Sequence, residues 1–252
     1  PVRRARAGGG TAARGAAHPM TRLVFLPGMV CDARLFGPQT ARFSGQRAVH
    51  HAPISGADSM EALAASVLAG APERFALAGL SMGGIVAMEV LRQAPERVER
   101  IALLDTNPLA EVEAVKARRG PQIDKARQGR MAEVIRDEMM PNYLAEPAAN
   151  QPLLDLCLQM AEDLGPQVFI RQSLALRDRP DQSETLRRFD GPSLVLCGRH
   201  DALCPVARHE LMADLLPRAT LEIIEGAGPR PTAGQPEENK AGPARRAARR
   251  RT

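Results

Sequence analysis

The chain contains no tryptophan and one tyrosine among its 252 residues, and aromatic residues make up only 3% of it. It also has no apolar run near the roughly 20 residues that a membrane-spanning helix needs. These absences argue against base stacking on nucleic acid and against insertion into a bilayer, so we expect neither partner. Four cysteines are present without the paired spacing of a zinc site (Cys31, Cys157, Cys197 and Cys204). We therefore expect no metal, no disulfide and a reducing, cytoplasmic location.

The net charge of +5 arises at the two ends of the chain. Residues 1–19 contain four arginines and residues 240–252 contain six basic residues, and neither segment contains an acid. The body between them is mildly acidic, which leaves nucleic-acid binding by an arginine tail as a minor alternative. Both ends are poor in large apolar side chains, so we expect residues 1–19 and 229–252 to be disordered, with Met20 as a natural start.

Short apolar runs alternate with helical patterns, which is typical of a mostly parallel sheet flanked by helices. With 44% hydrophobic residues the chain can bury one substantial core. The pattern predicts strands at residues 22–26, 47–52, 75–78, 101–104, 193–197 and 220–224. It predicts helices at residues 60–68, 82–93 and 205–216.

The alternation stops at about residue 110, and a helical stretch rich in methionine, glutamine and arginine follows until about residue 186. We interpret residues 110–186 as a helical cap inserted into an α/β core of residues 20–109 and 187–228. The methionines of this stretch and Phe169 are expected mainly to pack the cap on itself and on the sheet. Some of them would line an acyl pocket.

Residues 75–84 read Phe-Ala-Leu-Ala-Gly-Leu-Ser-Met-Gly-Gly. A strand that runs through Gly-x-Ser-x-Gly directly into a helix is a nucleophile elbow. The serine of such a turn adopts a strained backbone conformation, and the flanking positions tolerate only very small residues. Gly79 and Gly83 meet this requirement, so Ser81 is the candidate nucleophile.

A serine that attacks a carbonyl needs two N–H groups aimed at the developing oxyanion. The amide of Met82, directly after the serine, is one candidate. The other is the amide of Met29, in the loop after the first strand, where Pro27 and Gly28 let the backbone turn. A Pro-Gly pair after a strand is also common in ordinary turns, so the second assignment stays open.

From Thr21 to about Glu237 the chain resembles the single-domain serine esterase branch of the α/β-hydrolase family. Residues 80–87, 94–98 and 103–106 are similar to the elbow, helix and next strand of small carboxylesterases and enol-lactonases. The family orders its catalytic triad as serine, acid and histidine. Residues 194–201, followed by Pro205, resemble the family's acid loop. The resemblance therefore implies Asp201 as the catalytic acid, with Asp105 at the end of an earlier strand as the alternative.

The same resemblance puts the catalytic histidine at position 229, where this chain has proline. Residues 221–228 reproduce the approach to that position, and residues 231–232 and 235–237 keep the downstream register. Because the Pro229 side chain has no proton to exchange, Ser81 would lack the base that activates it.

The five histidines of the chain offer little to replace this base. His18 lies in the expected extension, His50 and His51 lie on or near the second strand, and His209 is expected in a solvated or partly packed position on a helix. His200 adjoins Asp201, but neighbouring loop residues rarely hold each other toward a third group.

We therefore expect a serine hydrolase of carboxylic esters, thioesters or lactones that forms an acyl-enzyme on a small-molecule substrate, without cofactor or metal. The serine argues against dehalogenases and epoxide hydrolases of this fold, which attack with a carboxylate; acyl transfer and cofactor-free haloperoxidase chemistry fit the same groups. The alternative is a non-catalytic ligand-binding protein that has lost its base. The natural substrate and the oligomeric state do not follow from the sequence.

Overall fold

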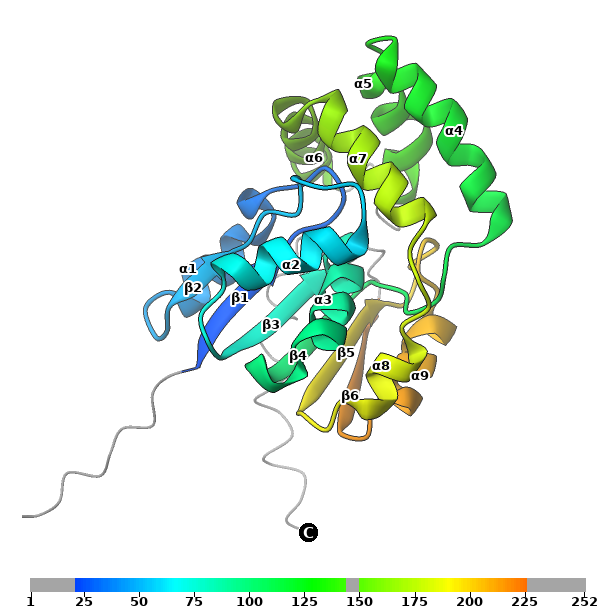
Figure 1. Cartoon of the computed structure of the whole chain (residues 1–252). Coiled ribbons are helices and arrows are strands. Elements are labelled where there is room, and N and C mark those ends of the chain that lie inside the picture. Colours follow the sequence, from blue (N-terminus) through cyan, green and yellow to red (C-terminus); the bar gives the residue numbers. More distant parts are fainter. Residues whose placement is uncertain (1–20, 144–149, 226–252) are drawn as a thin grey trace, which may run out of the picture.

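The computed structural model describes residues 21–143 and 150–225, which form one six-stranded sheet with helices around it (Figure 1). The strand order is β2-β1-β3-β4-β5-β6, and every neighbouring pair is parallel. The strands are β1 (Arg22–Leu26), β2 (Val49–His51), β3 (Phe75–Leu80), β4 (Val98–Leu104), β5 (Ser193–Gly198) and β6 (Ala219–Ile224). The predicted α/β fold is confirmed.

Some strand boundaries differ from the predicted ones. At these boundaries, backbone pairing with the neighbouring strand decides where the strand ends, and not the apolar composition of its residues. β3 is buried along its whole length and pairs with β1 up to Gly79 and with β4 up to Leu80, so it continues to the residue before Ser81. β2 is shorter than predicted, because only Val49, His50 and His51 pair with β1 at the edge of the sheet.

In the described part of the chain, the helices around the sheet are α1 (Gly37–Phe43), α2 (Met60–Gly70), α3 (Met82–Gln93), α8 (Ser183–Arg188) and α9 (Val206–Leu215). Of these, α2, α3, α8 and α9 pack successively on one another, and α2, α3 and α8 lie in front of the sheet in Figure 1. The sequence pattern did not predict α1, because this helix has no buried residues and therefore no apolar periodicity.

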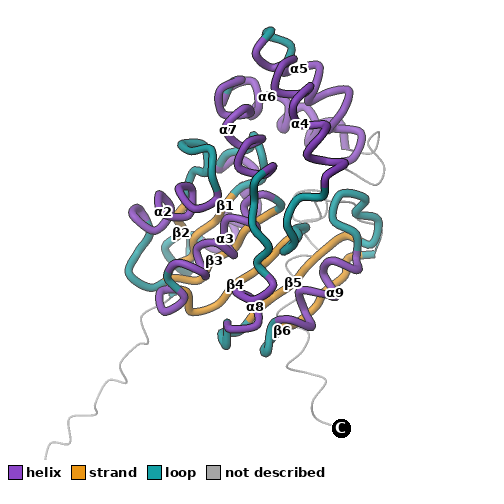
Figure 2. Tube along the Cα trace, turned by 45° about the vertical axis from the view of Figure 1, so that its right-hand side comes forward, coloured by secondary structure: helices purple, strands orange, loops and turns teal. Residues whose placement is uncertain are grey.

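A second group of helices lies beyond the carboxyl ends of the strands (Figures 1 and 2). It comprises α4 (Glu113–Arg127), α5 (Met131–Glu133), α6 (Gln151–Leu164) and α7 (Pro166–Arg177), with a π-helical turn over Val134–Met139 and a 3-10 turn over Met140–Asn142. Met131, Met140, Met160 and Phe169 are buried within this group or against the sheet. The division into a core and a cap, with boundaries at about residues 110 and 186, stays a prediction. Helix α8 begins before the boundary at residue 186 and ends after it.

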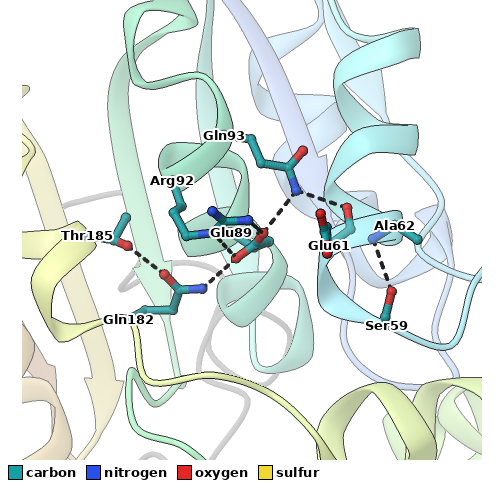
Figure 3. A network of polar contacts seen from close by, with 8 residues as sticks. All are labelled: Ser59, Glu61, Ala62, Glu89, Arg92, Gln93, Gln182 and Thr185. Carbon is teal, nitrogen blue, oxygen red and sulfur yellow. Dashed lines mark hydrogen bonds and ion pairs between the residues drawn. The ribbon is translucent and has the colours of Figure 1, made fainter.

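A buried carboxylate connects α3 to its neighbours (Figure 3). Glu89 is 1% exposed and accepts hydrogen bonds from Arg92 (2.6 Å), Gln93 (3.0 Å) and Gln182 (2.7 Å). Gln93 also donates to the backbone oxygen of Glu61 in α2. Burial by itself would raise the pKa of Glu89, but these hydrogen bonds outweigh it and hold the pKa below its ordinary value.

The described ranges contain no helix that is long and apolar enough to cross a membrane. The segments predicted to be disordered, residues 1–19 and 229–252, lie outside the described residues, and so does Pro229.

Candidate active site

Ser81 occupies the turn between β3 and α3, where the sequence pattern predicted it. Its backbone is at φ 54° and ψ −117°, a conformation that is rare for any residue other than glycine. Its N–H donates to the carbonyl oxygen of Leu104 at the end of β4 (2.8 Å), which anchors the turn to the sheet. Ser81 is partly exposed, whereas Leu80 and Met82 on either side of it are buried. This strained turn therefore presents one side chain at the carboxyl edge of the sheet.

Close backbone contacts explain why glycines flank this turn. A Cβ atom at Gly79 would collide with the backbone of Gly83, and one at Gly83 would collide with the carbonyl groups of Leu26 and Pro27. A third glycine, Gly84, was not singled out from the sequence, and a Cβ there would collide with the side chain of Thr106. The start of α3 is thus pressed against both the loop after β1 and the end of β4.

The two candidate oxyanion amides lie on the segments that this packing brings together. Met82 is the first residue of α3, and Met29 lies in the loop after Leu26 and Pro27. Within residues 21–143 and 150–225, neither amide donates a hydrogen bond to a protein acceptor. Both N–H groups therefore remain available for a substrate oxygen as far as the described residues are concerned.

The two candidate acids, separated by 96 positions in the sequence, lie together at the ends of neighbouring strands. Asp105 follows β4 and is 1% exposed; its Oδ1 accepts a hydrogen bond from the Gly198 amide (3.2 Å). Asp201 follows β5 and is 4% exposed; its Oδ1 accepts from the amides of Leu203 (2.8 Å) and Cys204 (2.7 Å).

Burial raises the pKa of Asp201 to about 6. The two backbone amides and an interaction with the Asp105 side chain lower it in part, without cancelling the effect of burial. Among the described residues, the hydrogen bonds to Asp201 therefore offset only part of the effect of burial on its pKa.

The expectation that His209 is solvated or partly packed is wrong, because this side chain is fully buried. Its Nε2 accepts a hydrogen bond from the Thr106 amide (3.1 Å) and its Nδ1 lies 3.4 Å from the Pro205 oxygen. Burial lowers the pKa of His209 to about 4, so the ring is neutral at pH 7. With both nitrogens engaged in this way, His209 cannot serve Ser81 as a base.

The other histidines differ in their surroundings. His51 contacts the Thr40 hydroxyl (2.9 Å) and stacks on Phe25 beside the sheet edge. His200 is exposed in the turn before Asp201, and no hydrogen bond within the described ranges holds its ring. His18 lies outside the described residues, as does Pro229.

Two further residues that the sequence pattern did not single out contact these segments. The Thr106 hydroxyl donates to the Ser81 carbonyl oxygen (2.8 Å). Gln172 in α7 accepts a hydrogen bond from the amide of Val30, next to Met29 (2.7 Å). The sequence pattern gave neither residue a role at the site, and strand order and helix packing bring both of them to it.

No group of three or more His, Cys, Asp or Glu side chains within the described ranges is arranged to hold a metal ion. The four cysteines, all of which lie in these ranges, form no disulfide.

Comparison with known proteins identifies the class to which this fold and site belong. Residues 23–239 match the model of the alpha/beta hydrolase family, and the chain belongs to this family. The chain is therefore an enzyme of the α/β-hydrolase type, and the predicted family resemblance is confirmed.

Individual relatives are similar over most of their length. The chain is 24% identical over 233 residues to a pimeloyl-[acyl-carrier protein] methyl ester esterase of Aliivibrio salmonicida. The aligned region covers 86% of this chain and 88% of that protein. Its structure resembles a thermophilic esterase from Thermogutta terrifontis, with a TM-score of 0.80, 25% identity, and coverage of 88% of this chain and 87% of the other. It also resembles the enol-lactonase from Burkholderia xenovorans LB400, with a TM-score of 0.79, 19% identity, and coverage of 88% and 89%.

Proposed function

We propose that this protein is a serine hydrolase that acts on small-molecule carboxylic esters, thioesters or lactones through an acyl-enzyme on Ser81. The observation that carries this proposal is the strained conformation of Ser81, at φ 54° between a buried strand and the start of α3. A relative named as a methyl ester esterase and a structural neighbour named as an esterase support an ester as the substrate.

In the proposed reaction, Ser81 Oγ attacks the carbonyl carbon of the substrate and the carbonyl oxygen becomes an oxyanion. The amides of Met29 and Met82 donate hydrogen bonds to this oxyanion. Collapse of the intermediate expels the alcohol, thiol or lactone hydroxyl and leaves the acyl group on Ser81. Water then attacks the acyl-enzyme, releases the acid and returns the proton to Ser81.

Both halves of this reaction need a base that removes the proton from the nucleophile and gives it to the leaving group. Asp201 is proposed to orient such a base, but Pro229 stands at the position where the resemblance implies a histidine. Loss of the histidine alone costs a serine protease about a million-fold in turnover. We therefore propose that the chain with Pro229 turns over slowly and that Pro229→His accelerates it.

The second candidate function, a ligand-binding protein without turnover, is favoured by the same proline. In both cases we propose that residues 110–186 act as a cap over a core of residues 20–109 and 187–228 and set the preference for the acyl group.

Labelling with a fluorophosphonate, which reacts with activated serines, tests the proposal. We expect slow labelling of the unmodified chain, faster labelling of Pro229→His, and none when Ser81→Ala is added to either. Circular dichroism on each variant verifies that it is folded. Hydrolysis of matched aryl esters, thioesters and lactones by fresh, unlabelled protein of each variant that reacts with the probe then identifies the preferred leaving group.

Each outcome separates the candidates. Rapid labelling of the unmodified chain that is lost in His200→Gln would mean that His200 supplies the base. Absence of labelling in a folded Pro229→His variant would contradict the hydrolase proposal and favour the ligand-binding protein.

A further inference from the structure

The segment after β1, residues 27–34, ends in the first turn of a 3-10 helix (Ala33–Phe36) and carries the candidate oxyanion amide of Met29; we refer to it as the oxyanion loop. Helices α6 and α7 contact this loop at three points, although they lie more than 120 positions further along the chain. The Val30 amide donates to Gln172 (2.7 Å), the Asp32 amide donates to the Met160 sulfur (3.4 Å), and Arg34 pairs with Asp163 (2.8 Å).

The contact with Gln172 differs from the other two because it is fully buried and uses both ends of one side chain. Gln172 Oε1 accepts from the Val30 amide, and Gln172 Nε2 donates to the Ile54 carbonyl oxygen (2.8 Å). Only 1% of Gln172 is exposed, so water cannot replace these partners. The carboxamide therefore bridges the oxyanion loop and the loop after β2 from a single position on α7.

Val30 is the residue at which the oxyanion loop is most strained. Its φ is 47°, which is unusual for a β-branched side chain, and its side chain is buried. Such conformations persist only where their surroundings hold them in place. The hydrogen bond to Gln172 is a specific contact that favours this orientation of the Val30 peptide group.

The orientation of Val30 matters for the neighbouring residue. The Val30 N–H belongs to the peptide group that follows Met29, so fixing its direction restricts ψ of Met29. Only φ of Met29 then separates this fixed peptide group from the one that carries the Met29 N–H, which narrows the directions open to that N–H. Oxyanion stabilisation depends on N–H groups that already point to where the charge develops.

We propose that Gln172 is a positioning residue for the oxyanion hole, through which helix α7 orients the Met29 amide by way of Val30. The inference rests on the proposed function, because it assigns an oxyanion role to Met29. Gln172 itself does not touch the reacting atoms. It acts on the rate of acyl transfer to Ser81 and not on the binding of the substrate's acyl chain.

A pair of neighbouring variants separates this role from simple packing. Gln172→Met keeps the volume of the side chain and removes both hydrogen bonds. The control is Arg171→Met, because Arg171 Nε donates to the Ser55 oxygen (3.1 Å) and so connects α7 to the loop after β2, while among the described residues it forms no hydrogen bond or ion pair with the oxyanion loop. Gln172→Glu is a third variant that keeps an acceptor for Val30 and loses the donor to Ile54.

The first measurement is fluorophosphonate labelling of these variants in the Pro229→His background, because the phosphonyl oxygen occupies the oxyanion hole. Loss of a single oxyanion donor lowers rates about 100- to 1000-fold, so a misaligned donor is expected to lower the maximal labelling rate constant on the order of tenfold. In Gln172→Met we expect this loss with an apparent affinity that changes less than about twofold. Arg171→Met should change neither, and Gln172→Glu should lie between Gln172→Met and the parent. Equal losses in Gln172→Met and Arg171→Met would overturn the inference.

The second measurement does not depend on catalysis and uses the full chain with Pro229. Gln172→Met should shift the amide resonance of Met29 and speed hydrogen exchange at Val30 by about tenfold or more, whereas Arg171→Met should leave both unchanged. Unchanged Met29 and Val30 signals in Gln172→Met would overturn the inference. If these signals respond but no variant is labelled, the positioning role is supported and only the proposed hydrolase function has failed.

Discussion

The hydroxyl group of Thr106 donates a 2.8 Å hydrogen bond to the carbonyl oxygen of Ser81, the residue with the strained backbone at the start of α3. The backbone N–H of Thr106 donates to His209 Nε2 in α9 (3.1 Å). The side chain of Thr106 also fills the space beside Gly84 that a Cβ atom would need. One residue at the end of β4 therefore connects the strained turn at Ser81 to helix α9.

Replacing this hydroxyl should loosen the turn. Thr106→Val keeps the shape of the side chain and removes the donor to Ser81, so we expect a loss of about 1 kcal/mol in the free energy of unfolding and slower labelling of Ser81. Urea denaturation and fluorophosphonate labelling measure the two effects. Thr106→Ser, which retains the hydroxyl, is the control and should keep the labelling rate. A Thr106→Val variant that is as stable and as reactive as the parent would show that the bond is not needed.

His209 should make the protein less stable in mild acid. The pKa of His209 is lowered from 6.5 to about 4, so below pH 6.5 the unfolded chain binds a proton that the folded chain does not. The free energy of unfolding should therefore fall between pH 6.5 and 4, by up to roughly 3 kcal/mol from this group.

Urea denaturation at several pH values, compared with His209→Gln, isolates this contribution. Glutamine can still accept a hydrogen bond from the Thr106 amide but does not titrate, so the variant should lack this part of the pH dependence. Identical pH profiles for parent and variant would mean that His209 is protonated as easily in the folded chain as in the unfolded one.

The buried Asp201 carboxylate should cost stability at neutral pH. The pKa of Asp201 is raised from 3.8 to about 6, so the folded state favours the protonated form and loses stability as the pH rises from 3.8 through 6. Asp201→Asn retains an oxygen for the amides of Leu203 and Cys204 and carries no charge. We expect it to raise the free energy of unfolding at pH 7 by about 1–3 kcal/mol and to have no such effect at pH 4.

The same substitution distinguishes the two candidate acids once a base is present. In the Pro229→His background, Asp201→Asn should slow labelling by about 1000-fold or more if Asp201 orients the histidine, because an asparagine favours the wrong tautomer. Asp105→Asn is the matched comparison. A larger loss in Asp105→Asn would assign the acid to the end of β4 instead.

The network around Glu89 should contribute stability that depends on pH in the opposite sense to Asp201. The pKa of Glu89 is held below its ordinary value of 4.5, so its contribution is present above that pH and is lost as the pH falls through the folded pKa. Glu89→Gln removes the charge that faces Arg92 and should lower the free energy of unfolding at pH 7 by about 1–3 kcal/mol.

Glu61→Gln is the control for this change, because Glu61 is exposed, its hydrogen bond to Gln93 uses the backbone oxygen, and its charge has only a minor influence on Arg92. Urea denaturation at pH 7 should show little effect of Glu61→Gln. An equally small effect of Glu89→Gln would mean that the ion pair with half-exposed Arg92 adds no net stability.

Much of the fold could be read from short stretches of sequence. Strands β1 and β5 begin where the apolar runs predicted, and α3 spans the predicted residues 82–93, because strand and helix periodicity is encoded within about ten residues. The position of Ser81 in a strained turn could also be predicted from the neighbouring residues. Glycine is the only residue type that the close packing at positions 79 and 83 admits, and the sequence has glycine at both.

The surroundings of the candidate site depend instead on contacts between distant segments. The meeting of Asp105 with Asp201 follows from the pairing of β4 with β5, and the burial of His209 follows from the packing of α9 beside the end of β4. The bridge from Gln172 to Val30 joins residues 142 positions apart. Such contacts have no periodicity of their own, because strand order and helix packing bring the side chains together only after the chain has folded. Residues 75–84 alone were therefore enough to propose Ser81 as the nucleophile, whereas the groups that hold the candidate oxyanion loop and set the pKa of the candidate acid could be found only in the folded chain.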